Sequence, residues 1–368
     1  MGGDFAPTAT VAAAAAISRE TTIRVLLVGH PDRLKEQLDL HPHDASRVSI
    51  VPAMEVVGMS EKPKEALLAK RDASITVAAR TVAEGGADAL VSAGSTGALV
   101  LAAAKNIPLL EGVKRAALAA VYPTRMRSFN NDRFALILDV GATVRCTSEQ
   151  LLQFAYMGHA YASRISKVPA PAIGLLNMGE EETKGDEILT AAYRMMKEDP
   201  RLNFIGNIEG IDIPRGVADV VVTSGFVGNV VLKMLEGVSE TVVRLARYAH
   251  KERLAWRLGL LALSSAIDQL KSITDWQQYG GAPLLGFTHP FIKAHGRSNA
   301  RAVTNAIKVA HKALAGNLCG NIARTMAELD QRSHRGRLTS SPDPGATGHT
   351  GGHTGGPGDA GGASEVDA

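Results

Sequence analysis

The chain has 368 residues, of which 45% are apolar, 4% aromatic and 21% charged, and its formal net charge at pH 7 is +3. A chain of this length buries roughly 75% of its unfolded surface, so one or two globular domains with a large core are expected. The small net charge and the scarcity of aromatic side chains argue against nucleic-acid binding, which depends on basic patches and stacking surfaces.

The cysteine and hydropathy patterns exclude further classes of protein. Cys146 and Cys319 lie far apart and form no C-x-x-C motif, so the sequence supports neither a disulfide framework nor a zinc knuckle and fits a reducing cytoplasm. The alanine-rich run at residues 11–17 follows no Lys or Arg, so we interpret it as a buried helix rather than a signal sequence. Apolar stretches stay below the about 18 residues that a spanning helix needs, which predicts a protein that is soluble or lies on a membrane surface.

Strands and helices alternate along the chain. After a turn at residues 1–7, helices are predicted at residues 8–19, 33–38 and 73–84. Two further helices are predicted to begin at 148 and at 186, another to end at 248, and a closing pair to cover 300–329. Strands are predicted at residues 23–28, 48–51, 87–91, 135–138, 172–176, 204–205 and 220–222. Such alternation implies right-handed crossovers, so the predicted fold class is α/β with a mostly parallel, doubly wound sheet.

Loops rich in Gly, Ser, Thr and Asn follow five of the predicted strands. They cover residues 92–98, 139–143, 177–185, 206–210 and 223–229. Because parallel strands direct their outgoing loops to one edge of the sheet, we expect all five loops to line one crevice. Glycine allows close backbone approach and helix N-termini favour anions, so phosphate is the expected ligand, although each loop alone is also typical of an ordinary turn.

The loop at residues 177–185 carries unusual chemistry for a connector. It combines an amide, three successive carboxylates, a hydroxyl and the ammonium of Lys184. Three adjacent glutamates cannot all face one metal ion, so we expect no metal. Lys184 and the free N–H groups of the next helix are better interpreted as an anion-binding site, and a solvated acidic turn is the alternative. The sequence has no P-loop, and its only G-x-G-x-x-G follows no predicted strand, so no nucleotide cofactor is expected.

Six motifs together resemble one family. They are MGGD at 1–4, SAGSTGA at 92–98, LDVGA at 138–142, GEEETKG at 179–185, GNIEG at 206–210 and YGGAPLLG at 279–286. Over residues 1–329 the chain resembles the PlsX-type phosphate acyltransferases of bacteria. The resemblance implies transfer of a fatty acyl chain from acyl carrier protein to inorganic phosphate, the entry step of phospholipid synthesis. It also implies a homodimer and a sheet core like that of isopropylmalate dehydrogenases and phosphotransacetylases.

This reaction requires a held phosphate and a donor for the oxyanion of the tetrahedral intermediate, but no side-chain nucleophile. Matched to the family motifs, Lys184, Ser92, Thr96 and Asn229 are expected to hold phosphate or the oxyanion. Asp186 or His295 is expected to orient a group or accept a proton, and for His295 a structural role is equally compatible. The other expected substrate contacts are Asp4, Gly94, Ser95, Gly97, Asn177, Glu182, Asn207 and Gly225.

We expect a catalytic domain at residues 1–330 with a protruding helical arm at 244–278. In the arm, apolar residues recur at helical spacing and arginines crowd its start; the apolar residues are Trp256, Leu260, Leu263, Ile267 and Leu270. Such a stripe lies either in a membrane interface or against a partner subunit, and the resemblance, which implies peripheral membrane association, favours the membrane. The tail at 331–368, rich in Gly, Ser and Pro, is expected to be disordered.

Two other functions stay open: a phosphotransacetylase that uses acyl-CoA, and a non-catalytic membrane scaffold.

The start of the chain raises a separate expectation, because in the family that it resembles a short apolar strand runs directly into the Met-Gly-Gly-Asp turn. Without that strand, its neighbours in the sheet would leave buried N–H and C=O groups unpaired, at a cost of about 1–3 kcal/mol each. We therefore expect Met1 to be an internal methionine preceded by a β-branched apolar run.

Overall fold

The structure is a computed structural model that describes residues 1–124, 134–252 and 280–339. The chain forms two compact units, Met1–Leu329 and Asp330–Ala368, and the fold below is that of the first. Most of the predicted arm and tail lies outside the described residues. Helix α13 (Leu318–Thr339) continues past the predicted boundary at 330, because residues 331–339 are mainly helix-forming and the glycine-rich composition starts later.

The centre of the fold is an eight-stranded sheet with the order β3-β10-β9-β4-β5-β8-β6-β7. Its strands are β3 (Leu90–Ser92), β4 (Ala117–Pro123), β5 (Phe134–Leu138), β6 (Ala172–Leu176), β7 (Asn203–Ile208), β8 (Val220–Val222), β9 (Ala282–Leu285) and β10 (Phe291–Lys293). A separate parallel pair consists of β1 (Val25–Gly29) and β2 (Val48–Pro52). The α/β class and the mostly parallel pairing are confirmed.

Two strands reverse direction inside this sheet. β4 pairs antiparallel with both β5 and β9, and β9 pairs antiparallel with β10, which is parallel to β3. β3 and β10 therefore run opposite to β5, β6, β7 and β8. The prediction that all five loops leave one edge of the sheet is wrong for the loop at 92–98, because the β4 and β9 strands, which the sequence did not indicate, lie between.

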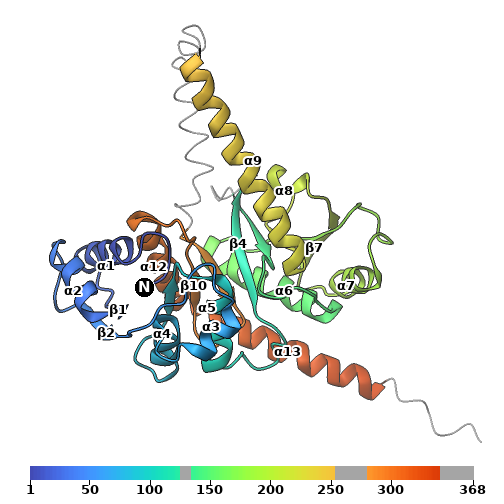
Figure 1. The fold of residues 1–368 in the computed structure, drawn as a ribbon. Coiled ribbons are helices and arrows are strands. Elements are labelled where there is room, and N and C mark those ends of the chain that lie inside the picture. The colour runs from blue at the N-terminus through green and yellow to red at the C-terminus, as the bar shows by residue number, and fades with distance from the viewer. Residues whose placement is uncertain (125–133, 253–279, 340–368) are drawn as a thin grey trace, which may run out of the picture. The chain divides into compact units, whose positions relative to one another are not determined.

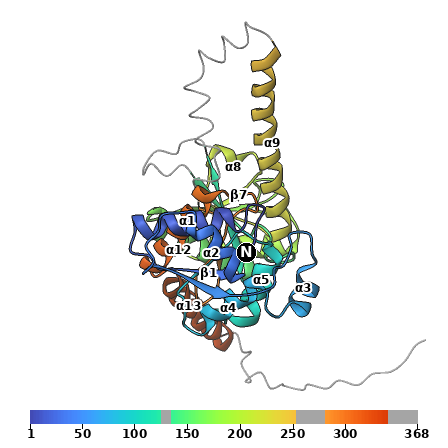
Figure 2. The same cartoon turned by 60° about the vertical axis from the view of Figure 1, so that its left-hand side comes forward.

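Helices cover both faces of the sheet. They are α1 (Thr8–Glu20), α2 (Pro31–Asp39), α3 (Pro63–Ala69), α4 (Ser74–Ala83), α5 (Thr96–Asn106), α6 (Ser148–Tyr161), η1 (Ala162–Ser166), α7 (Glu187–Lys197), α8 (Asp212–Arg215), α9 (Gly225–Glu252) and α12 (Ala300–Ala315), besides α13. In β5 and β8, Ile137 and Val221 point to the core under α5, whereas Leu136, Leu138 and Val220 point to the core under α6. Figures 1 and 2 show α1 alongside α12, which attaches the β1–β2 pair to the rest.

The carboxylate of Asp139 joins three segments at the end of β5. The side chain is fully buried, and Oδ1 accepts the backbone N–H groups of Leu118 (2.8 Å), Gly141 (3.1 Å) and Ala142 (3.0 Å). Oδ2 accepts the N–H of Thr143 at 2.6 Å. Burial raises the pKa of Asp139, and these four donors oppose that rise. One side chain thus fixes the loop after β5 to the start of β4.

We expect Asp139→Asn to destabilise the fold by about 1–3 kcal/mol, because the amide that replaces Oδ2 cannot accept the Thr143 N–H and leaves a buried donor unpaired. Urea unfolding followed by circular dichroism measures this change. Asp186→Asn is the matched control: Asp186 is exposed, accepts one N–H at the start of α7, and asparagine caps a helix equally well. Equal stability of the two variants would contradict the role assigned to Asp139.

Candidate active site

Three segments meet around the N-terminal turn. The Asp4 N–H donates to the Gly296 carbonyl at 2.8 Å, after the end of β10. A Cβ on Gly2 would lie 2.7 Å from the Gly94 Cα, so these two backbones approach this closely only because residue 2 is glycine. Gly94 also donates its N–H to Ser92 Oγ at 3.2 Å. The contacts gather Asp4, Ser92 and Gly94, all predicted site residues.

Lys293 ends β10 beside this turn, and its side chain is only 7% exposed. Its ammonium donates to the Ala294 carbonyl. Burial and, to a smaller extent, the nearby charge of Lys233 lower the pKa of Lys293 to about 8, and Asp4 opposes the shift. Lys293, Lys233 and Arg297 therefore face the carboxylates of Asp4 and Glu236, which leaves a small excess of positive charge in the cluster. Anions neutralise such a cluster.

His295 follows in the same segment and is half-buried. Its Nδ1 accepts the Arg297 N–H at 3.2 Å, so the proton of the neutral ring lies on Nε2. Burial lowers the pKa of His295; Glu236 raises it, and Lys233, Lys293 and Arg297 lower it. At neutral pH this imidazole is therefore a hydrogen-bond donor through Nε2, which suits stabilisation of an oxyanion better than acceptance of a proton.

The loop at 177–185 is held by two amides. Asn177 donates to the Lys184 carbonyl (2.9 Å), and the buried Asn207 donates to the Glu181 carbonyl (2.8 Å). Glu182 forms an ion pair with Lys197 at 2.7 Å. For Asn177, Glu182 and Asn207, the structure thus shows contacts that maintain the shape of the loop.

The side chains of Lys184 and Asp186 make different contacts. The Lys184 side chain is 46% exposed, and its ammonium forms an ion pair with Glu181 at 3.8 Å, longer than a hydrogen bond. The ammonium is therefore accessible from solvent at one side of this pair. Asp186 accepts the Leu189 N–H at 2.9 Å as the N-cap of α7. The structure thus assigns Asp186 a helix-capping role, and its catalytic role stays a prediction.

Helix α9 runs from the loop that contains Asp139 toward Lys293 and His295. Its first residue, Gly225, packs against Asp139, where a Cβ would lie 2.5 Å from Oδ2. One turn later Asn229 lies against Gly141. A further turn brings Lys233, paired with Glu236 at 2.7 Å, into the field of Lys293 and His295. Figure 1 shows α9 running past β4 between these places.

The loop after β3 begins α5. Ser95 is its N-cap position and Thr96 its first residue, so the N–H groups of the first turn, which have no acceptor within the helix, follow Ser92 closely in the sequence. Gly97 has a packing role as well, because a Cβ there would lie 2.7 Å from the Pro63 ring.

Sequence reasoning missed Lys293 and Lys233. Lys293 had a usable signal, since it is a charged residue that directly follows the apolar pair Phe291-Ile292 at the end of a short strand. Lys233 had none, because a lysine on an amphipathic helix usually faces water. Among the described residues, no group of three or more His, Cys, Asp or Glu side chains is placed to hold a metal ion.

Known proteins resemble the chain in sequence and in fold. A family model described as fatty acid synthesis protein matches residues 1–321. The phosphate acyltransferase of Heliobacterium modesticaldum is 44% identical over 323 residues, which cover 88% of this chain and 94% of that protein. The phosphate acyltransferase of Desulfitobacterium hafniense is 44% identical over 327 residues, which cover 89% and 96%.

Among solved structures, a phosphotransacetylase from Streptococcus pyogenes matches with a TM-score of 0.55 at 18% identity, over 82% of this chain and 88% of that one. The EutD phosphotransacetylase from Staphylococcus aureus gives 0.51 at 16% identity, over 82% and 89%. These matches confirm the fold. The sequence matches identify the chain as an acyltransferase that belongs to the phosphate acyltransferase family.

Proposed function

We propose that the protein transfers a fatty acyl group from acyl-[acyl carrier protein] to inorganic phosphate, giving an acyl phosphate for phospholipid synthesis. The observation that carries the proposal is the buried Lys293 beside Lys233, His295 and the Ser92 loop. A buried ammonium in an electropositive cluster suits a small, strongly charged anion such as phosphate.

The chemistry needs only positioning and charge. A phosphate oxygen attacks the thioester carbonyl, the C–O bond forms, and the tetrahedral intermediate expels the carrier's thiolate as the C–S bond breaks. Phosphate is partly dianionic at neutral pH, so no strong base is required. Lys293, Lys233 and the first N–H groups of α5 balance the phosphate charge, and His295 Nε2–H donates to the oxyanion. Ser92 is placed to orient the phosphate.

A phosphotransacetylase that uses acyl-CoA is the second candidate function, favoured by the names of the structural matches. Turnover of acyl carrier protein thioesters and of CoA thioesters, compared at equal acyl length, separates the two. A non-catalytic scaffold would show no phosphate-dependent loss of thioester with either substrate.

Lys293→Met should lower the rate of acyl phosphate formation about 10²- to 10³-fold, because a charged contact to the reacting phosphate disappears. Trapping the acyl phosphate with hydroxylamine measures the rate. Lys105→Met, an exposed lysine at the end of α5, is the matched control and should stay within about twofold of the parent. A near-normal rate for a folded Lys293→Met protein would remove Lys293 from the site.

The Lys293 charge should also set a pH limit. Because its pKa is lowered to about 8, the ammonium is present below pH 8 and is lost as the pH rises through that value. The KM for phosphate should therefore rise above pH 8. Lys293→Arg, which stays charged, should remove that rise even if turnover falls. An unchanged pH profile in this variant would assign the pH limit to another group.

Lys184→Ala should lose about 10²- to 10³-fold in turnover while the melting temperature stays unchanged. The fold should survive because Asn177 and Asn207, and not the Lys184 side chain, hold this loop. Normal turnover would mean that the 177–185 loop does not contact phosphate.

We propose that α9 contributes to a homodimer interface. A line of exposed apolar side chains at helical spacing supports this assembly: Phe226, Val230, Met234, Val238 and Leu245. No helix in the described part of the chain could span a membrane. Peripheral membrane association, proposed for the arm at 244–278, rests mainly on residues outside the described ranges.

Met234→Glu combined with Val238→Glu should convert the dimer into a folded monomer, as measured by light scattering at micromolar concentration. Met234 is 70% exposed. Leu68→Glu, which changes a side chain that is 66% exposed on α3, should leave the dimer intact. If the double variant stays dimeric but no longer sediments with anionic lipid vesicles, this face contacts lipid instead.

A further inference from the structure

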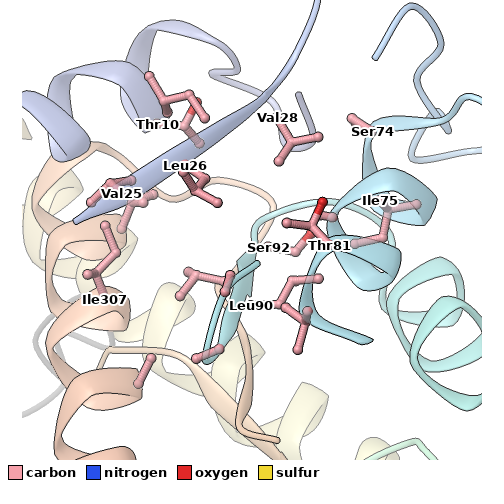
Figure 3. Close-up of a pocket in the computed structure, with 18 of the residues that line it drawn as sticks. Thr10, Val25, Leu26, Val28, Ser74, Ile75, Thr81, Leu90, Ser92 and Ile307 are labelled. Atoms are coloured by element: carbon pink, nitrogen blue, oxygen red, sulfur yellow. The ribbon is translucent and has the colours of Figure 1, made fainter. Parts of the chain in front are cut away.

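Residues 54–73 form a closed loop that contains α3, called the α3 loop below. Its two ends are joined by hydrogen bonds: the Ser74 N–H donates to the Glu55 carbonyl at 2.8 Å, and the Asp72 N–H donates to a side-chain oxygen of Glu55 at 3.0 Å. Figure 3 shows Ser74, at the start of α4, in the lining of a cavity that Ser92 also lines. The α3 loop therefore rejoins the fold beside a cavity that the end of β3 borders.

A small apolar core attaches the α3 loop to α5. Val57, Ala66 and Ala73 of the loop are buried in one cluster with Ala98, which lies in the first turn of α5. Figures 1 and 2 both show α3 beside α5. The loop is thus packed on the helix whose first turn belongs to the predicted phosphate site.

An ion pair fixes the part of the α3 loop that precedes the helix. The ammonium of Lys70 lies 2.7 Å from the Glu61 carboxylate, and the same carboxylate accepts the Gly58 N–H at 2.6 Å. Lys70 also donates to the Val56 carbonyl at 2.8 Å. The bonds from Lys70 and Gly58 lower the pKa of Glu61. They hold the backbone on the amino-terminal side of Met59, so the position of this residue is set by the loop.

The end of the Met59 side chain lies against the candidate active site. A Cβ on Gly296 would approach the Met59 Cε to 2.9 Å, so the glycine leaves room for this methyl group. The same Cβ would lie 3.8 Å from the Asp4 carboxylate, and Gly296 directly follows His295. Met59 as a whole is 48% exposed. An apolar side chain therefore borders both the solvent and the polar site.

A site that binds only phosphate needs no apolar side chain at its edge, because charge and hydrogen bonds hold phosphate. The proposed reaction also brings an acyl chain, which begins at the carbonyl carbon whose oxyanion accepts from His295. The first methylene groups of that chain must therefore lie close to His295 and to the Met59 methyl group beside Gly296. Methionine suits such a contact, since its unbranched, polarisable side chain adapts to the shape of a flexible partner.

We propose that Met59 is a specificity-determining residue that contacts the first methylene groups of the acyl chain, and that the α3 loop holds it in place. The inference rests on the proposed transfer of an acyl group to phosphate. The contact gives the site a preference for a substrate with a hydrocarbon chain over one with an acetyl group, because an acetyl group has no methylene group to place against Met59.

Two unreactive analogues of the product test the contact: acetylmethylphosphonate and hexanoylmethylphosphonate, in which a methylene group replaces the bridging oxygen of the acyl phosphate. Calorimetry measures the dissociation constant of each, so the test needs no turnover. Met59→Ala should weaken binding of the hexanoyl analogue about five- to tenfold and that of the acetyl analogue less than about twofold, because only the longer chain loses an apolar contact. Met59→Leu, which conserves the volume, should bind both analogues as the parent protein does.

Met54→Ala is the matched control, because Met54 is 58% exposed and lies at the other end of the α3 loop, where its N–H donates to Asp72. This variant should leave both dissociation constants unchanged. If Met59→Ala changes both constants by the same factor, or changes neither, the assignment of Met59 is wrong while the acyl phosphate site stands. An equal loss in Met54→Ala would also overturn it. If neither analogue binds the parent protein, the proposed function fails together with this inference.

Discussion

The carboxylate of Asp139 is the interaction on which the middle of this fold depends. It lies buried at the end of β5, where it has lost its contacts with water, and burying a carboxylate in this way is unfavourable. Four backbone N–H groups replace those contacts. One of these donors belongs to β4, so the same side chain that closes the loop after β5 also secures the antiparallel neighbour. Gly225 packs closely against this carboxylate and Gly228 against the backbone carbonyl of Asp139, which sets where α9 begins.

The position of α9 has consequences for function. The helix starts at the Asp139 loop and carries Asn229, Lys233 and Glu236 toward the end of β10. Charged residues of α9 and of the segment after β10 thereby contribute to one electrostatic field. The loop at 177–185, held by Asn177 and Asn207, presents Lys184 separately at the end of β6.

Much of the fold was predictable because it rests on local signals. The strands at 172–176 and 220–222 match β6 and β8, since short apolar runs between polar loops are typical of buried parallel strands. Helices α1, α6 and α12 begin at the residues where helices were predicted to start. β4, β9 and β10 were missed: β4 is rich in alanine, a weak strand former, and β9 and β10 are too short to show a period.

The sequence by itself determined most of the helices and the parallel strands, the polar loops that follow them and, through six motifs, the family. Only the tertiary structure decided the direction of β3 relative to β5, because strand direction depends on pairing between segments far apart in the chain. It also decided the burial of Lys293, which lowers the pKa of that side chain; the charge of Lys233 on α9 acts in the same direction, and Asp4 in the N-terminal turn opposes it. These neighbours are remote in sequence, and no local pattern encodes the electrostatic field that they create at a buried ammonium.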